Sequence, residues 1–192
     1  MAHVLVVGGT GMLKQVSLFL AAHDNVVSVI ARTSPDLKTL EAEAEQSGGK
    51  INSLSLDYRD HDSLKQNLEQ SIEINGPVTL VVNWMHSDAL DASQVIAEVL
   101  NRTSPVCRYF QVLPTNPSDN RRGRTFFEDP FANFERVLYR KIILGYQEEK
   151  ELSRWLTHQE ISEGIIDALR NDRKDAVIGI WDAGQQRTQQ SA

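Results

Sequence analysis

Three glycines near the N-terminus have the spacing of a site that binds a pyrophosphate. Gly8, Gly9 and Gly11 follow the apolar run 4–7 and precede an amphipathic segment that begins at Met12. Glycines let the backbone turn tightly and approach an anion, and the N–H groups at the start of a helix point toward the negative charge. This order of strand, glycine turn and helix start predicts that the chain binds a nicotinamide dinucleotide.

The phosphate loop of nucleoside triphosphatases is the competing interpretation of the same residues. That loop needs a glycine before its lysine, where this chain has Leu13, and a serine or threonine for magnesium, where it has Gln15. The sequence therefore favours a dinucleotide over a nucleoside triphosphate.

Apolar runs alternate with amphipathic stretches through the first 113 residues. We expect strands at 4–7, 26–31, 51–56, 78–83 and 108–113, and helices at 12–23, 34–45, 60–74 and 89–100. Ser34 as a cap followed by Pro35 is typical of a helix start. Such alternation implies right-handed crossovers. The predicted fold class is α/β, a Rossmann-like doubly wound, mostly parallel sheet of six to seven strands in three layers.

The pattern changes after residue 113. The segment 114–134 holds three prolines and the run Arg121-Arg122-Gly123-Arg124, so we expect a long irregular loop there. Beyond it we expect a strand at 136–146, a charged turn at 147–152, a short return strand at 153–156 and a last strand at 177–181. Thr157 and Glu160 have the spacing of a capping box for a helix between the return strand and the last strand. We expect one domain over 1–183 and a disordered polar tail over 184–192.

Composition limits the kinds of protein that this chain can be. A chain of 192 residues with 41% hydrophobic content can bury one substantial core. A formal net charge of −6 argues against binding to nucleic acid or to an anionic membrane. Cys107, the one cysteine, excludes an intrachain disulfide, and no His/Cys cluster has metal-ligand spacing. Without a basic leader or a run of roughly 20 apolar residues, the chain is expected to be soluble and cytoplasmic.

Roughly the first 115 residues resemble the short-chain dehydrogenase/reductase superfamily in its divergent Gly-Gly-Thr-Gly form. Gly8 and Gly11 match the first two glycines of the Gly-x-x-Gly-x-x-Gly turn. Arg32 follows the second strand, where the family senses the adenosine ribose, and Asp57 follows the third, where the family contacts the adenine. Asn83 ends the fourth strand, where the family has Asn-Ala-Gly. The resemblance implies a set of cofactor-binding residues, namely Gly8, Gly9, Thr10, Gly11, Met12, Arg32, Thr33, Asp57, Tyr58, Asn83 and Trp84.

Two positions bear on which cofactor binds and how. Lys14 stands where the family has its third glycine, and it could pair with a phosphate, crowd the ribose, or lie along the surface with its charge in water. Arg32 stands where an acidic residue would accept hydrogen bonds from a free 2′-hydroxyl, whereas an arginine pairs with a 2′-phosphate. With Thr33 beside it, Arg32 predicts NADP in preference to NAD, and a solvated arginine at a strand end is the other interpretation.

Several residues have a structural interpretation beside the functional one. Asp57 and Tyr58 could hold the adenine edge, or Asp57 could cap the helix that begins near residue 60. Asn83 could tie strands together. Trp84, Met85 and His86 replace the small residues that normally leave room for the cofactor. His86 could donate a proton near the nicotinamide, although a histidine at a strand end is more often structural or exposed.

The family's catalytic set is where the resemblance ends. Family enzymes use a serine after the fifth strand and a Tyr-x-x-x-Lys pair on the next helix, in which the lysine lowers the tyrosine pKa. Here the serine position falls near Thr115, and Pro130 opposes a long helix beyond it. The one literal match, Tyr146 with Lys150, falls at an expected hairpin, so we interpret it as a coincidence.

Two functions from different classes follow from the resemblance. The first is an NADP-dependent oxidoreductase that acts on a small carbonyl, alcohol or enoyl substrate, with Thr115, His86 or Tyr146 as candidates for the proton donor. The second is a non-catalytic dinucleotide sensor or partner-binding protein on the same scaffold. In both, the cofactor would lie across the carboxyl ends of the first, second and fourth strands. The phenylalanines 126, 127, 131 and 134 are expected to anchor the long loop to the sheet, and a wall of a substrate pocket is their other interpretation.

Overall fold

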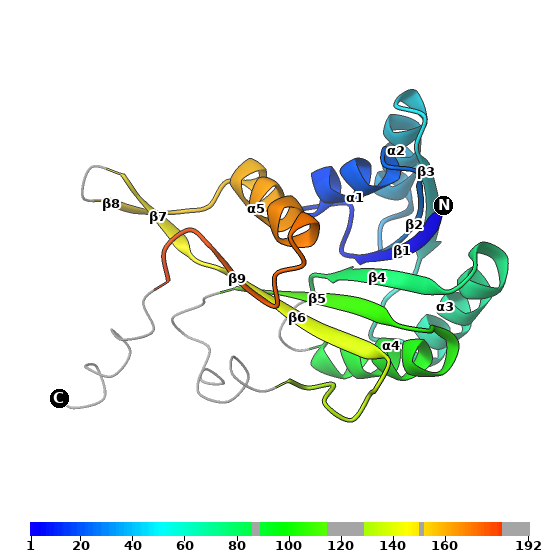
Figure 1. Ribbon diagram of the computed structural model, residues 1–192. Helices are drawn as coiled ribbons and strands as arrows, with labels where there is room; N and C mark the ends of the chain where they lie inside the picture. Colours follow the sequence, from blue (N-terminus) through cyan, green and yellow to red (C-terminus); the bar gives the residue numbers. More distant parts are fainter. Residues whose placement is uncertain (86–88, 115–128, 150–151, 182–192) are drawn as a thin grey trace.

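A seven-stranded, fully parallel sheet forms the centre of the protein (Figure 1). The computed structural model describes residues 1–85, 89–114, 129–149 and 152–181. The strands, in the order in which they lie in the sheet, are β3 (Lys50–Ser55), β2 (Asn25–Ala31), β1 (Ala2–Val7), β4 (Val78–Asn83), β5 (Cys107–Pro114), β6 (Val137–Leu144) and β9 (Asp175–Ile178). The sheet grows outward from β1 in both directions, so β1 and β4 flank the switch point, where open α/β sheets bind ligands.

Helices cover both faces of this sheet, and the predicted three-layer fold is confirmed. One face carries α1 (Lys14–Ala21), α2 (Ser34–Gln46) and α5 (His158–Arg170), and the other carries α3 (His61–Asn75) and α4 (Leu90–Thr103) (Figure 1). Each helix buries an apolar stripe, for example Val16 and Leu20 of α1. None of the helices that the structure describes is long and apolar enough to span a bilayer.

The structure corrects four details of the sequence prediction. The first residue of α2 is Ser34 and its N-cap is Thr33, so Ser34 is not the cap. Where a charged turn was expected at 147–152, the chain forms the strand β7 (Tyr146–Glu149). This strand pairs with β8 (Leu152–Trp155) in an antiparallel hairpin, and β8 begins one residue earlier than the expected return strand. The last strand lies at 175–178 rather than 177–181, because Gly179 turns the chain with a φ of +80°.

At the end of the expected loop, aromatic side chains and not a helix pack on the sheet. Phe131 is 2% exposed and meets the rings of Tyr109 and Tyr139 edge-on at centroid distances of 4.8 and 5.5 Å. Phe134 packs against the same cluster. The prediction that these phenylalanines anchor the loop is confirmed for Phe131 and Phe134. Phe126, Phe127 and the Arg121-Arg122-Gly123-Arg124 run lie outside the described residues.

A buried polar network joins β1, β2 and α3. The His3 ring, 3% exposed, contacts the Gly76 carbonyl through Nδ1 at 2.7 Å and the Ser28 hydroxyl through Nε2 at 2.7 Å. Ser28 in turn lies 2.8 Å from the Ser71 hydroxyl, and the Asn52 amide donates to both serines. Burial lowers the pKa of His3, against the opposing effect of its hydrogen bond to Gly76, so the ring is held neutral.

Protonation of His3 is therefore expected to weaken the fold as the pH falls. Above the pKa of about 6.5 that a histidine has in the unfolded chain, the His3 ring is neutral in both the folded and the unfolded state, so the stability that its burial contributes is fully present. Below it, the unfolded chain takes up a proton that the folded chain resists, and the free energy of unfolding falls by at most about 1.4 kcal/mol per pH unit. Urea denaturation between about pH 7.5 and pH 5.5 measures this slope. His3→Asn should reduce the slope and His61→Asn, at an exposed helix start, should not; equal slopes in all three proteins would refute the prediction.

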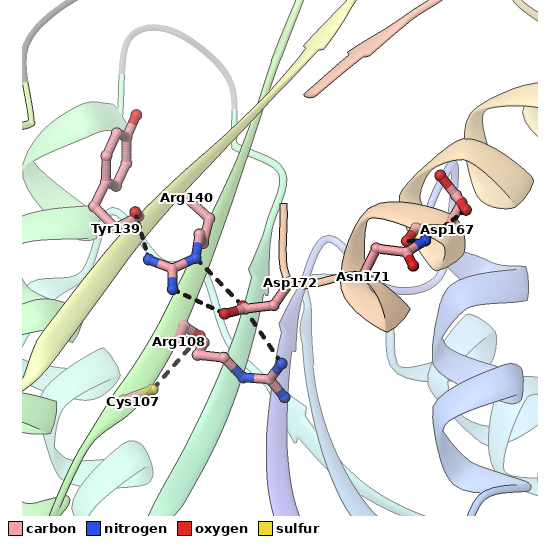
Figure 2. A network of polar contacts seen from close by, with 7 residues as sticks. All are labelled: Cys107, Arg108, Tyr139, Arg140, Asp167, Asn171 and Asp172. Atoms are coloured by element: carbon pink, nitrogen blue, oxygen red, sulfur yellow. Dashed lines mark hydrogen bonds and ion pairs between the residues drawn. The ribbon is translucent and has the colours of Figure 1, made fainter. Parts of the chain in front are cut away.

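A charged network fixes the turn between α5 and β9 to β5 and β6 (Figure 2). Asp172 accepts hydrogen bonds from Arg140 at 3.0 Å (Nη2 to Oδ2) and 3.3 Å (Nε to Oδ1), and Arg108 approaches the same carboxylate at 3.5 Å. Asp172 has a φ of +46°, in the left-handed region. Hydrogen bonds from Arg140, and the charges of both arginines, hold the pKa of Asp172 below its ordinary value.

Two substitutions at Asp172 separate the ion pairs from the backbone geometry. Asn tolerates a positive φ, so Asp172→Asn is expected to lower the free energy of unfolding by less than about 1 kcal/mol, because the carboxylate is 45% exposed. Asp172→Ala is expected to lower it by about 1–2 kcal/mol more, because alanine disfavours the left-handed region. Urea denaturation near neutral pH, where the carboxylate is ionised, compares the two. Equal losses would show that the positive φ carries no strain.

Candidate functional site

The glycine turn lies at the carboxyl end of β1, beside the switch point of the sheet. Gly8 adopts a φ of +76°, and its N–H donates to the Ile30 carbonyl of β2 at 2.9 Å. A β-carbon on Gly8 would lie 2.7 Å from the Trp84 carbonyl oxygen and 3.4 Å from Cδ1 of its indole. Both the backbone conformation and the close neighbour therefore require glycine at this position.

Gly9 and Gly11 have different tasks in the same turn. A β-carbon on Gly9 would lie 2.6 Å from Val29 and 2.7 Å from the Ser17 hydroxyl, so this glycine lets α1 pack closely on the sheet. Ser17 donates from its hydroxyl to the Gly9 and Leu13 carbonyls, both at 3.1 Å, and fixes the turn to α1. A β-carbon on Gly11, in contrast, would meet no atom within 4 Å. Gly11 is exposed, so the turn is open on this side.

The backbone of the turn offers hydrogen-bond donors to this open side. Its two ends are closed by the bond from Gly8 to Ile30 and by a bond of 3.0 Å from the Lys14 N–H to the Gly11 carbonyl. The N–H groups of Thr10, Gly11 and Met12 donate to none of the residues that the structure describes. Donors of this kind at a helix start suit an anion such as a pyrophosphate.

Lys14 does not stand free at this turn. Its ammonium lies 2.7 Å from a carboxylate oxygen of Glu43, in α2. None of the three sequence-based alternatives for Lys14 included this ion pair, because Glu43 is far away in the sequence. The pairing neutralises Lys14 with a protein carboxylate, so we do not count it among the phosphate-binding groups.

Arg32 and Thr33 lie at the carboxyl end of β2, next to the turn. Both are exposed. Among the described residues Arg32 has no ion-pair partner, and the Thr33 side chain makes no capping hydrogen bond although it is the N-cap of α2. Arg32 and Thr33 are thus consecutive exposed residues at the N-terminus of α2, and their guanidinium and hydroxyl are groups that suit a phosphate.

Asp57 and Tyr58, at the end of β3, point to different environments. Asp57 is exposed and accepts the Arg59 N–H at 3.0 Å. The cap of α3 is Asp60, which accepts the Ser63 N–H at 3.1 Å, so Asp57 does not have the capping role that was its alternative. Tyr58 is 8% exposed and packs in the core. Asp57 is therefore the member of the pair that faces solvent.

Asn83 ties β4 to its neighbours from a fully buried position. Its amide nitrogen lies 2.8 Å from the Tyr109 hydroxyl, 2.8 Å from Oε1 of Gln111 and 3.0 Å from the Ser93 hydroxyl. Burial is the main reason why the pKa of Tyr109 is raised far above its ordinary value. The sequence reasoning missed Ser93, Tyr109 and Gln111; the signal was two polar side chains inside the apolar run of β5. This cluster confirms that Asn83 ties β4 to β5 and α4.

Trp84 is the side chain that stands next to the glycine turn on the β4 side. Its N–H donates to the Val7 carbonyl at 3.1 Å, which extends the pairing of β1 and β4 by one residue. The indole is half-buried and packs against the core on the α1 face, as does Met12. The turn is therefore bordered by Arg32 on its β2 side and by Trp84 on its β4 side.

The residues considered for catalysis are not brought together by the described part of the chain. Tyr146 lies in β7, where its backbone exchanges hydrogen bonds with Ile180 at 3.0 and 2.7 Å. An extended strand separates residues four apart by about 13 Å, so Tyr146 is not in the helical arrangement that a Tyr-x-x-x-Lys pair needs. Lys150, Thr115 and His86 lie outside the described residues. Among the residues that are described, no group of three His, Cys, Asp or Glu could hold a metal ion.

Comparisons by sequence and by structure give different results. No protein-family model matches the chain, and no curated protein matches it. Solved structures do match. The citronellol catabolism dehydrogenase of Pseudomonas aeruginosa superimposes with a TM-score of 0.73 at 15% identity, over 92% of each chain. A short-chain type dehydrogenase/reductase from Mycobacterium ulcerans gives 0.67 at 14% identity, over 92% of this chain and 87% of that one. This chain has the fold of the short-chain dehydrogenase/reductases.

A third solved structure that matches contains NADPH. It is an actinorhodin polyketide ketoreductase with NADPH, and it superimposes with a TM-score of 0.67 at 16% identity, over 92% of this chain and 94% of that one. At such identities the likeness concerns the fold. Within the short-chain dehydrogenase/reductase fold, this chain keeps the first two motif glycines at Gly8 and Gly11 and departs from the pattern at Lys14 and Trp84.

Proposed function

We propose that the chain binds a nicotinamide dinucleotide along the carboxyl edge of β3, β2, β1 and β4. The observation that carries this proposal is the open turn at Gly11, where backbone N–H groups without described partners lie beside Arg32, which has no ion pair with any described residue. The order of the strands gives the order of the subsites. Asp57 would contact the adenine, Arg32 the adenosine ribose and residues 8–12 the pyrophosphate.

The cofactor is NADP(H) in preference to NAD(H) in this proposal. Arg32 and Thr33 can provide a guanidinium fork and a hydroxyl to a 2′-phosphate, and no acidic side chain stands at the end of β2 to accept a 2′-hydroxyl. The actinorhodin ketoreductase structure with NADPH supports this choice by likeness of fold. The cofactor would supply the hydride, and the protein would bind and orient it.

Two candidate activities follow from cofactor binding. An oxidoreductase that transfers hydride to or from a small carbonyl or alcohol is supported by the dehydrogenases that share the fold. A dinucleotide sensor without catalysis is supported by two residues. Tyr146 lies in a strand and not in the helix that a Tyr-x-x-x-Lys pair needs. Phe131 packs on the α4 side of the sheet between β5 and β6, in the part of the chain where the family has its catalytic helix. In either activity the cofactor site is the same.

A titration of the full chain with NADPH and NADH, followed by tryptophan fluorescence, tests the proposal. We expect saturable binding that is tighter for NADPH, with a change in fluorescence because Trp84 borders the site. Oxidation of bound NADPH by any member of a panel of small aldehydes and ketones would establish the oxidoreductase, and saturable binding without turnover would favour the sensor. Absence of saturable binding by both cofactors would overturn the proposed function.

A further inference from the structure

We propose that the indole of Trp84 is the surface on which the nicotinamide half of the cofactor rests, an inference that depends on the proposed function. Trp84 stands in place of a small residue of the family motif, and its ring is the large side chain that borders the glycine turn on the β4 side. The inference makes Trp84 a residue that positions the reactive half of the cofactor.

The order of the strands places the nicotinamide half next to Trp84. A dinucleotide consists of two nucleotide halves joined by a pyrophosphate, and the pyrophosphate subsite lies at the end of β1. Arg32, at the end of β2, fixes the adenosine half on one side of β1. The other half must then extend over the opposite neighbour, β4, which lies about 4.8 Å from β1. Trp84 directly follows β4, so its indole lies on this path.

Trp84 is held in place from three directions. Its backbone is fixed to β1 by the hydrogen bond to Val7 at 3.1 Å. Its carbonyl oxygen and the Cδ1 edge of its indole lie against Gly8, and its ring packs on the core cluster that includes Val82 and Leu13. A rigid aromatic ring at the rim loses little freedom when a ligand binds, so it can contribute most of its contact energy to affinity.

The chemistry of the two rings favours contact over exclusion. The indole is half-buried, so part of it remains open to a ligand. Nicotinamide is a flat ring that can stack on an indole, and stacking of a planar ring on an aromatic side chain contributes roughly 5- to 100-fold to affinity. If the indole instead obstructed the cofactor, replacing Trp84 with a smaller residue would strengthen NADPH binding.

Calorimetric titration with two ligands separates the nicotinamide half from the rest. NADPH covers the whole site, whereas adenosine 2′,5′-bisphosphate covers the adenosine half and ends at the first phosphate of the pyrophosphate, short of the nicotinamide half. For Trp84→Ala we expect NADPH to bind roughly tenfold more weakly and the bisphosphate to bind as in the unmodified protein. Unchanged bisphosphate binding also shows that the variant is folded. Trp84→Phe should retain most of the NADPH affinity, and Trp155→Phe, on the hairpin at a residue 65% exposed, should retain all of it.

Each other result has a distinct meaning. Tighter NADPH binding by Trp84→Ala would overturn the inference and identify the indole as an obstruction. An equal loss for both ligands would also overturn it, because Trp84 would then only support the turn, and Trp84→Phe would check this in a variant with a smaller change in volume. Failure of both ligands to bind the unmodified protein would overturn the proposed function itself, and this inference with it.

Discussion

Replacing Arg32 with alanine is expected to weaken NADPH binding by roughly 10- to 100-fold and to leave NADH binding nearly unchanged. Hydrogen bonds between a guanidinium and a phosphate contribute about 1.5–3 kcal/mol, and NADH has no 2′-phosphate to receive them. Arg32 is exposed and has no ion pair among the described residues, so its loss should not alter the fold. Calorimetric titration of both cofactors measures the two affinities.

Two further variants make this prediction specific. Arg32→Lys keeps the charge and loses the planar fork, so it should recover only part of the NADPH affinity. Arg102→Ala removes an exposed arginine of α4 that pairs with Glu69 at 2.9 Å on the other face of the sheet, and it should leave both affinities unchanged. Equal weakening of NADPH and NADH by Arg32→Ala would refute a role for Arg32 in selecting NADP.

Gly8→Ala is expected to be among the most destabilising substitutions of a single residue at this site. The φ of +76° costs an alanine about 1–2 kcal/mol, and a β-carbon 2.7 Å from the Trp84 carbonyl adds about 1–3 kcal/mol of overpacking. The carbonyl is backbone and is held by the pairing of β1 with β4, so it has little room to move away. Urea denaturation should show the loss of stability, and a titration should show loss of NADPH binding.

Gly11→Ala is the matched control, because it adds the same methyl group in the same turn. Its β-carbon would meet no protein atom within 4 Å, so the free energy of unfolding should change by less than about 0.5 kcal/mol. The added methyl group would instead stand on the side where we place the pyrophosphate, so NADPH binding should weaken. Similar stability losses for Gly8→Ala and Gly11→Ala would contradict the distinction between the two glycines.

The sequence predicted the elements that depend on local pattern. The segment 78–83 is apolar apart from Thr79 and Asn83, which is typical of a strand buried on both faces, and it forms β4 in the middle of the sheet. Thr157 and Glu160 form the predicted capping box. The glycine turn was predicted at the right place because strand, glycines and helix follow one another directly in the sequence.

Contacts between distant residues could not be predicted in the same way. The ion pair of Lys14 with Glu43 and the contact of Trp84 with Gly8 join residues that only the completed sheet brings together. Tyr146 was placed at the boundary of a charged turn, because its neighbours are polar. The turn begins as β7, which pairs with β8, and the backbone of Tyr146 also pairs with Ile180 beyond α5. Polar side chains therefore concealed a short strand, and its contact with Ile180 joins residues that lie far apart in the chain.

Amide hydrogen–deuterium exchange of the full chain, with and without NADPH, tests most directly whether a dinucleotide binds at the glycine turn. The N–H groups of Thr10, Gly11 and Met12 have no described acceptor, and phosphate oxygens would provide one. We predict slower exchange in residues 8–14 and 32–36, stronger at 32–36 with NADPH than with NADH, and no change in α4. Unchanged exchange in residues 8–14 at saturating NADPH, or protection confined to other segments, would contradict a dinucleotide site at this turn.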